Sequence, residues 1–192
     1  MSRRHPGFTI IELALVIVVI GILSTIVIVS YQGVQVRARD AKLIDAADKV
    51  KDAIQLFAVN SKHFPRGGYG ASTAIGASTE CTNGAAGFFA TAVYTCTVED
   101  TLVGSGYLPK GFSAGLPTNK LYSPPGGNGS LMVYNPYVAG AKKVMVFYYM
   151  EQPSAEDTSN FNAELTECGY VVANTIDPRD SWGMRNGICA DY

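Results

Sequence analysis

The sequence predicts an α+β fold in which one long N-terminal helix packs on a C-terminal antiparallel β-sheet. The chain opens with an apolar run, residues 8–29, and apolar residues then recur at three- and four-residue steps up to about residue 60, as on one face of a helix. From Leu131 onward, segments rich in Val, Tyr, Phe and Met alternate with turn residues, which is typical of strands. A sheet laid on the apolar helix face would bury both surfaces.

The first element is the apolar run from Phe8 to Val29, which has 22 residues and one charged side chain, Glu12. A helix needs roughly 20 apolar residues to cross a bilayer, so residues 8–29 are expected to form a transmembrane helix. A carboxylate inside such a run is costly, and its partner must be sought. A cut between Gly7 and Phe8 would create an α-amine about one helical turn from Glu12, able to offset the acid of a neighbouring subunit.

The residues around this acid resemble a known processing signal. A short basic leader, then Gly7-Phe8-Thr9, then Glu12 and an unbroken apolar run resemble the class III signal of type IV pilins and type II secretion pseudopilins. The resemblance implies that a prepilin peptidase removes residues 1–7 and methylates the new N-terminus. It also implies that Glu12, at the fifth mature position, is the assembly glutamate. The alternatives are an ordinary signal-anchor helix with a chance acid, and a cleaved secretory signal, although no small-x-small site convincingly follows the run.

Residues 30–62 are expected to continue the same helix as its amphipathic half. One side carries the apolar stripe that should pack against the globular domain, and the other is expected to face solvent or another subunit. The stripe comprises Leu43, Ile44, Ala47, Val50, Ile54, Phe57 and Ala58, and the charged side Arg39, Asp40, Asp45, Asp48, Lys49 and Asp52. The sequence His63-Phe64-Pro65, followed by Gly67 and Gly68, should end the helix.

Residues 63–192 are expected to form the globular head. Residues 69–120 lack periodicity and indicate loops with short elements. Three strands are predicted beyond them, at Leu131–Tyr134, Val144–Met150 and Gly169–Ala173. The tail from residue 174 to 192, if bridged to Cys168, resembles the disulfide-bounded C-terminal loop of type IV pilins.

The four cysteines, Cys81, Cys96, Cys168 and Cys189, allow three pairings that sequence alone does not decide. Proximity along the chain favours Cys81–Cys96 and Cys168–Cys189. A zinc site is the alternative, but close Cys-x-x-Cys spacing and paired histidines are absent from the sequence. Disulfides would imply an oxidising compartment, and therefore a C-terminal domain outside the cytoplasmic membrane.

Several function classes are disfavoured by the sequence. The net charge is −1 and no basic cluster stands out, so no general nucleic-acid binding is expected. Neither histidine has a convincing catalytic partner in the sequence, so no enzyme is expected. Because type II secretion pseudopilins can bind calcium, calcium is an alternative to having no cofactor, although the acids lack the fixed spacing of an EF-hand and are expected to be solvated loop residues. These acids are Asp157, Glu164, Glu167, Asp177 and Asp180.

The resemblance implies a structural subunit of an extracellular type IV pilus. The precursor would wait in the cytoplasmic membrane, meet the prepilin peptidase and an inner-membrane assembly platform, and then join a helical homopolymer that also contains minor pilins. The chain departs from type IV pilins at Val29, where they often carry proline. A type II secretion pseudopilin and a minor pilin acting as an adhesin or DNA-uptake module are the alternatives, followed by an enzyme anchored by a signal helix.

Overall fold

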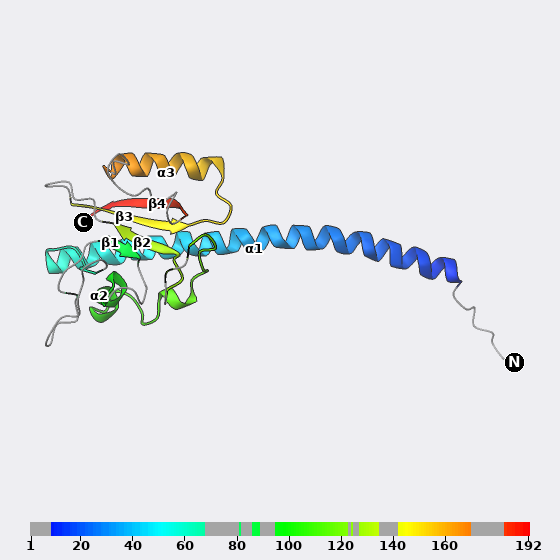
Figure 1. Cartoon of the computed structure of the whole chain (residues 1–192), viewed down its shortest axis with the longest axis horizontal. Helices are drawn as coiled ribbons and strands as arrows, with labels where there is room; N and C mark the ends of the chain where they lie inside the picture. Colours follow the sequence, from blue (N-terminus) through cyan, green and yellow to red (C-terminus); the bar gives the residue numbers. More distant parts are fainter. Residues whose placement is uncertain are drawn as a thin grey trace. The chain divides into compact units, whose positions relative to one another are not determined.

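The computed structural model describes residues 9–67, 81, 86–88, 95–122, 124, 127–134, 142–169 and 183–192. The chain divides into two compact units, residues 1–38 and 39–192. The elements in chain order are α1 (Ile10–Ser61), β1 (Ala86–Phe88), α2 (Val98–Gly104), a 3-10 turn η1 (Ser113–Gly115), β2 (Leu131–Tyr134), β3 (Lys143–Tyr149), α3 (Ala155–Glu167) and β4 (Met184–Asp191) (Figure 1). The predicted α+β class, a long N-terminal helix with an antiparallel sheet, is confirmed.

The described strands form one antiparallel sheet in the order β1-β2-β3-β4. Strand β2 has the predicted bounds, and β3 lies one residue earlier at each end than predicted. Met132 of β2 lies opposite Phe147 of β3, and Val146 of β3 lies opposite Ile188 of β4. Strand β3 is therefore central and pairs on both edges.

The sheet is covered on both faces, by α1 on one and α3 on the other (Figure 1). Alternate β3 residues divide between the two sides: Val144, Val146 and Tyr148 pack with α1, whereas Met145 and Phe147 pack with α3. The helix residues that meet them include Leu43, Val50, Ile54 and Phe57 of α1, and Phe161 and Leu165 of α3. Burial of both faces explains why β3 is apolar at nearly every position.

The predicted apolar stripe of α1 packs on the sheet as expected, but one member of the predicted charged side does not face solvent. Asp40 is only 6% exposed, and its carboxylate accepts hydrogen bonds from the backbone N–H groups of Glu151 (2.8 Å) and Gln152 (3.3 Å). Arg39 donates to Glu151 Oε2 from Nε (3.1 Å) and Nη2 (2.8 Å), and Lys120 Nζ pairs with Glu151 Oε1. These contacts fasten α1 to the segment that joins β3 to α3.

Replacement of Asp40 by alanine is expected to lower the free energy of unfolding by about 2–3 kcal/mol, because two part-buried backbone N–H groups lose their acceptor. Urea unfolding of the detergent-solubilised chain measures this change. The matched control is Asp45→Ala on the same helix, which removes an exposed pair with Lys49 at 2.6 Å and should change stability by less than about 0.5 kcal/mol. Equal losses in the two variants would contradict the anchoring role of Asp40.

Acidification should weaken the same anchor through Glu151. The hydrogen bond from Lys120, together with the hydrogen bond and charge of Arg39, lowers the pKa of Glu151 below its usual value, although partial burial acts in the opposite direction. Because the folded-state pKa is the lower one, the stabilisation is present above the ordinary glutamate pKa of about 4.3 and is lost as the pH falls through the folded-state pKa.

We therefore expect the stability difference between the native chain and a Glu151→Gln variant to be constant near neutral pH and to shrink below about pH 4. Urea unfolding at a series of pH values measures this difference. A difference that grows on acidification would contradict the assigned direction of the shift in the pKa of Glu151.

The C-terminal region departs from the sequence-based expectation. Asp157, Glu164 and Glu167, expected in loops, lie on helix α3, which begins with a capping box between Ser154 and Asp157. Gly169, expected to start a strand, lies in a turn after α3 with a φ of +68°. The remainder of that predicted strand, residues 170–173, lies outside the described residues.

The tail, expected to be a loop, contains strand β4. Gly187 in this strand lies close against the core, since a Cβ there would be 2.6 Å from Met145 Cε and 3.1 Å from the carbonyl oxygen of Val146. A side chain at residue 187 would therefore displace the end of Met145 and press on the backbone of Val146, so packing favours glycine at this strand position.

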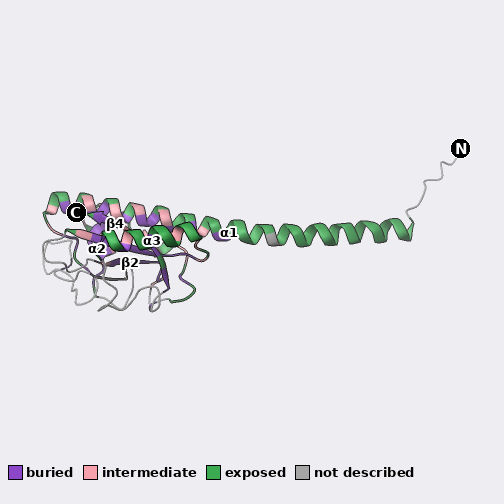
Figure 2. Ribbon diagram, turned by 90° about the horizontal axis from the view of Figure 1, so that it is seen from above, coloured by how far each residue is buried: buried purple, intermediate pink, exposed green. Residues whose placement is uncertain are grey.

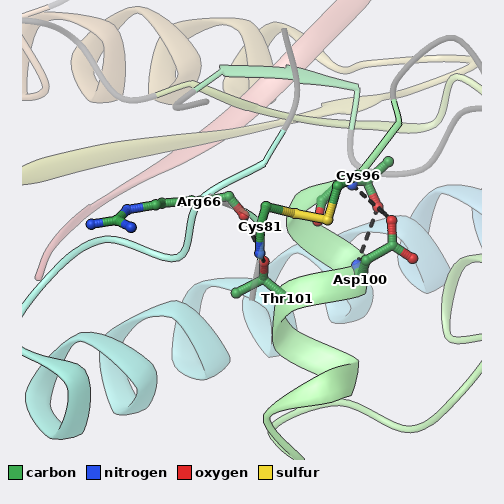
Figure 3. The surroundings of a disulfide bond; sticks show 6 residues. Arg66, Cys81, Cys96, Asp100 and Thr101 are labelled. Atoms are coloured by element: carbon green, nitrogen blue, oxygen red, sulfur yellow. Dashed lines mark hydrogen bonds between the residues drawn. A yellow bond between two sulfur atoms is a disulfide. The ribbon is translucent and has the colours of Figure 1, made fainter. Parts of the chain in front are cut away.

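Both disulfides are present with the pairing that proximity favours, at Cα separations of 5.8 Å for Cys81–Cys96 and 5.5 Å for Cys168–Cys189. Figure 3 shows the first of them beside α2. The backbone N–H of Cys81 donates to Thr101 Oγ1 (3.0 Å), and that hydroxyl donates to the carbonyl of Arg66 (2.8 Å). The disulfide thus holds residue 81 beside the start of α2, and the Thr101 hydroxyl joins α2 to the chain that follows α1.

Candidate functional site at the start of α1

Glu12 lies in the first turn of α1 and is bound to the residue that precedes the helix. Thr9 donates to Glu12 Oε2 from both its backbone N–H and its hydroxyl, each at 2.8 Å. The backbone N–H of Glu12 in turn donates to Thr9 Oγ1 at 3.3 Å. These reciprocal bonds form a capping box, which satisfies two backbone N–H groups and accommodates the acid inside an apolar segment.

The sequence interpretation missed this local role of Glu12. The signal was present, because Thr-x-x-Glu before an apolar run is the pattern of a capping box. Gly7 and Phe8, the predicted processing residues, lie outside the described residues, so the structure does not place them relative to Glu12. Thr9 is neutral, and the capping box therefore leaves the charge of Glu12 available for a cationic partner.

Beyond Glu12, α1 presents an apolar surface that its own unit does not bury. The large apolar side chains between Ile10 and Ile28 are between 46% and 88% exposed. Figure 2 shows this part of the helix in the colour of exposed residues. By length and composition the helix could cross a membrane. An apolar surface of this extent indicates contact with lipid or with other apolar helices.

The hydroxyl groups inside this apolar surface are satisfied within the helix. Ser24 Oγ donates to the carbonyl of Ile20 and Thr25 Oγ1 to the carbonyl of Ile22, both at 2.7 Å. Such bonds to the preceding turn allow serine and threonine to enter an apolar environment without an unpaired donor.

Gly21 lies in the same stretch and has open space around it. A Cβ at this position would meet no other described atom within 4 Å, so no described contact of the subunit requires a glycine here. Glycine weakens a helix by about 0.8–1.0 kcal/mol relative to alanine. A small residue that no described contact within the subunit requires is typical of a surface that a second helix approaches closely.

The acids considered for calcium that the structure describes already have partners within the head. Asp157 caps α3, and Glu164 accepts a hydrogen bond from the backbone N–H of Cys189. Glu167 Oε1 lies 3.9 Å from Lys143 Nζ. Asp177 and Asp180, the remaining acids considered for calcium, lie outside the described residues. Among the residues that the structure describes, no group of three His, Cys, Asp or Glu side chains is arranged to hold a metal ion.

Residues Asn128-Gly129-Ser130 match the N-glycosylation sequon, and their side chains make hydrogen bonds within the head. Asn128 Nδ2 donates to the carbonyl of Ser113 at 2.8 Å, and the buried hydroxyl of Ser130 contacts the carbonyl of Pro117. Both polar side chains of the motif are therefore engaged inside the loop network that precedes β2.

The fold and the N-terminal segment define a class of protein in which one apolar helix, with an acid in its first turn, continues into an α+β head. Residues 2–28 match the family model for the prokaryotic N-terminal methylation motif, a range that includes Gly7, Phe8 and Glu12.

Curated relatives come from two systems. The chain is 33% identical over 79 residues to a fimbrial protein of Neisseria meningitidis, covering 41% of this chain and 44% of the relative. It is 32% identical over 78 residues to a type IV major pilin protein of Neisseria gonorrhoeae, covering 41% of this chain and 47% of the relative. It is 27% identical over 78 residues to the type II secretion system core protein G of Escherichia coli, covering 41% of this chain and 54% of the relative.

The motif and these relatives together support a resemblance of this chain to the family of type IV pilins and type II secretion pseudopilins. The aligned part spans about half the length of the curated relatives. No solved structure matches the chain.

Proposed function

We propose that this protein is a pilin, the structural subunit of an extracellular type IV pilus. The observation that carries the proposal is the exposed apolar surface of α1, which has one carboxylate at its start and is left uncovered by its own unit. A surface of this kind is stable in a bilayer before assembly and against copies of itself afterwards.

The proposed assembly begins in the cytoplasmic membrane. A prepilin peptidase cuts between Gly7 and Phe8 and methylates the new amine. An inner-membrane assembly platform then brings the subunit to the growing filament, where the amine of Phe8 meets Glu12 of a neighbour. The carboxylate, held by the neutral Thr9 in the single subunit, gains a cation from the neighbouring chain, and the buried charge is compensated.

The apolar helices would form the filament interior, with the heads outside. Contact between the start of one helix and a different part of the next is heterologous, and such a contact gives a filament when it does not close. The two disulfides support a head that lies in an oxidising compartment outside the cytoplasmic membrane. Open space around Gly21 supports close approach of a second helix.

The choice of pilus over secretion pseudopilus rests on the Cys168–Cys189 disulfide, which bounds the C-terminal segment in the way that resembles type IV pilins. The similarity to core protein G from Escherichia coli and from Aeromonas hydrophila favours the pseudopilin as the second candidate. A minor pilin with an adhesive or DNA-uptake role is the third.

Electron microscopy of cell surfaces, combined with a secretion assay on a deletion strain, separates these candidates. We expect the deletion strain to lose long surface filaments and to keep normal protein export. Loss of export with unchanged surface filaments would identify a pseudopilin instead. The abundance of the chain in sheared filaments then distinguishes a major subunit, which should dominate, from a scarce minor one.

A further inference from the structure

The described part of the head, within residues 39–192, exposes large apolar side chains at two places. The first, which we call the helix patch, consists of Leu56 (58% exposed) and Val59 (64% exposed) on α1. The second, the loop patch, consists of Leu121 (55% exposed) and Tyr122 (38% exposed) before β2. Each pair is contiguous on its element, unlike isolated surface apolar residues, which need no explanation.

The helix patch adjoins a surface pocket of about 260 Å³. Its lining residues are Ala58, Val59, Lys62, His63, Lys142 and Tyr192. Two of the lining residues pack against aromatic residues of the core. The ring centroids of His63 and Phe57 are 5.5 Å apart, and those of Tyr192 and Phe64 are 5.2 Å apart. The pocket is therefore formed by residues already held in place by the core, and it has room for an apolar side chain.

The loop patch is presented on a fixed backbone. Asn119, only 2% exposed, accepts hydrogen bonds at Oδ1 from the backbone N–H groups of Leu121 (2.8 Å) and Tyr122 (3.1 Å). Its Nδ2 donates to the carbonyl of Gly129 at 3.0 Å, and its own backbone N–H donates to the carbonyl of Asn128 at 2.8 Å. A preorganised loop loses little conformational entropy on binding, so this apolar pair is suited to contact another surface.

The two patches lie at opposite ends of the head portion of α1. Lys120, next to the loop patch, pairs with Glu151, which also pairs with Arg39 at the start of this portion. Leu56 lies 17 residues further along the helix, about 26 Å away at 1.5 Å per residue. The patches therefore cannot cover each other within one subunit, whereas copies displaced along the helix direction could pair them.

We propose that the loop patch of one subunit docks into the pocket beside the helix patch of a second copy of this chain, with Leu121 against Val59. The two surfaces differ, so the contact is heterologous and repeats along a filament without closing. Lys120 is already engaged by Glu151, a carboxylate that it shares with Arg39, so the cation of the loop is held away from a pocket bordered by Lys62 and Lys142. This inference rests on the proposed filament function and specifies how neighbouring heads meet.

Two small patches make a contact far below the size of a stable interface, which buries at least about 1,000 Å² in total. We therefore expect separate heads to remain monomeric. In the filament, assembled helices would hold neighbouring heads at a high effective concentration, where a weak contact becomes occupied. The contact must consequently be tested in assembled filaments of the full chain.

Paired cysteines provide the test, because all four native cysteines are in disulfides. Filaments are sheared from cells that produce the Leu121→Cys, Val59→Cys double variant, oxidised, and separated on a non-reducing denaturing gel. We expect a ladder of covalent multimers that reduction abolishes. The matched control combines Leu121→Cys with Ala41→Cys, an exposed position at the other end of the same helix portion, and should give no ladder.

A charge pair provides a second measurement that needs no oxidation. Leu121→Lys should lower the yield of sheared filaments severalfold, because it brings a cation to a pocket bordered by Lys62 and Lys142. Adding Val59→Asp should restore the yield by pairing opposite charges across the contact. This pair of charge substitutions also tests the contact if a cysteine variant prevents filament formation.

Each outcome has a defined meaning. A ladder with Val59→Cys but not with Ala41→Cys supports the contact, as does rescue by the opposite charge. If the native chain forms filaments but the double variants show neither a ladder nor rescue, this contact is overturned and the filament function stays intact. Absence of surface filaments from cells that produce the native chain would overturn both.

Discussion

Replacement of Glu12 by alanine is expected to leave a stable, membrane-held subunit and to abolish filaments. The variant loses the only charged side chain in residues 8–29, so membrane retention should not weaken. It also loses the group proposed to meet the N-terminal amine of the neighbouring subunit. Membrane fractionation and electron microscopy of sheared material measure the two effects separately.

The capping box provides a matched control for this experiment. Glutamine can replace glutamate in a capping box, so Glu12→Gln should keep the hydrogen bonds with Thr9 while removing the charge. We expect Glu12→Gln to lack filaments as well, because the proposed contact needs a negative charge. Normal filaments from Glu12→Gln, with none from Glu12→Ala, would show that Glu12 acts only as a cap.

Removal of the Cys168–Cys189 disulfide is expected to have the largest effect on the stability of the head. Cys168 is 1% exposed and caps the end of α3, and Cys189 lies in β4. The disulfide therefore joins the helix to the strand that it covers. A double Cys168→Ala, Cys189→Ala variant should lose about 2–5 kcal/mol of unfolding free energy, as is typical when a native disulfide is removed from a small domain.

The other disulfide serves as the control for locating this effect. A double Cys81→Ala, Cys96→Ala variant should also lose stability, but it should leave the pairing of β3 with β4 protected, because the described contacts of these cysteines are with each other and with the start of α2. Hydrogen exchange at the Ile188 amide measures this pairing. Similar exchange at Ile188 in both variants would contradict a local role for Cys168–Cys189.

The parts of the fold that the sequence predicted well have a strong periodic signal. The apolar run and stripe of α1 continue for more than forty residues, and β2 and β3 consist almost entirely of apolar and aromatic residues. Helix α3 buries only Phe161 and Leu165 along its length, so its apolar period was too sparse to recognise. The pair Ser154 and Asp157 was the usable signal for its start.

Strand β4 and the buried position of Asp40 depend on tertiary contacts, which no local sequence pattern predicts. Asn186-Gly187 suggests a turn, yet pairing with β3 holds these residues in a strand and Met145 fills the space beside the glycine. Asp40 was predicted to face solvent or another subunit because it lies opposite the apolar stripe. Its carboxylate is instead the acceptor for backbone N–H groups more than a hundred residues away in sequence.

At the candidate site, the sequence identified the acid and the apolar surface but missed the capping box. The predicted helix and the single acid at its start follow from composition alone, whereas the partner of Glu12 inside the subunit depended on recognising the Thr9-x-x-Glu12 spacing. The proposed partner in the filament depends on the processing of residues 1–7.

Mass spectrometry of the N-terminal peptide from sheared surface material tests this processing most directly. We expect a mature chain that begins with methylated Phe8, recovered from filaments in which this chain is the main component. Abundant filaments built of chains that retain Met1 would contradict the cut between Gly7 and Phe8, and with it the proposed contact between the freed amine and Glu12 of the neighbouring subunit.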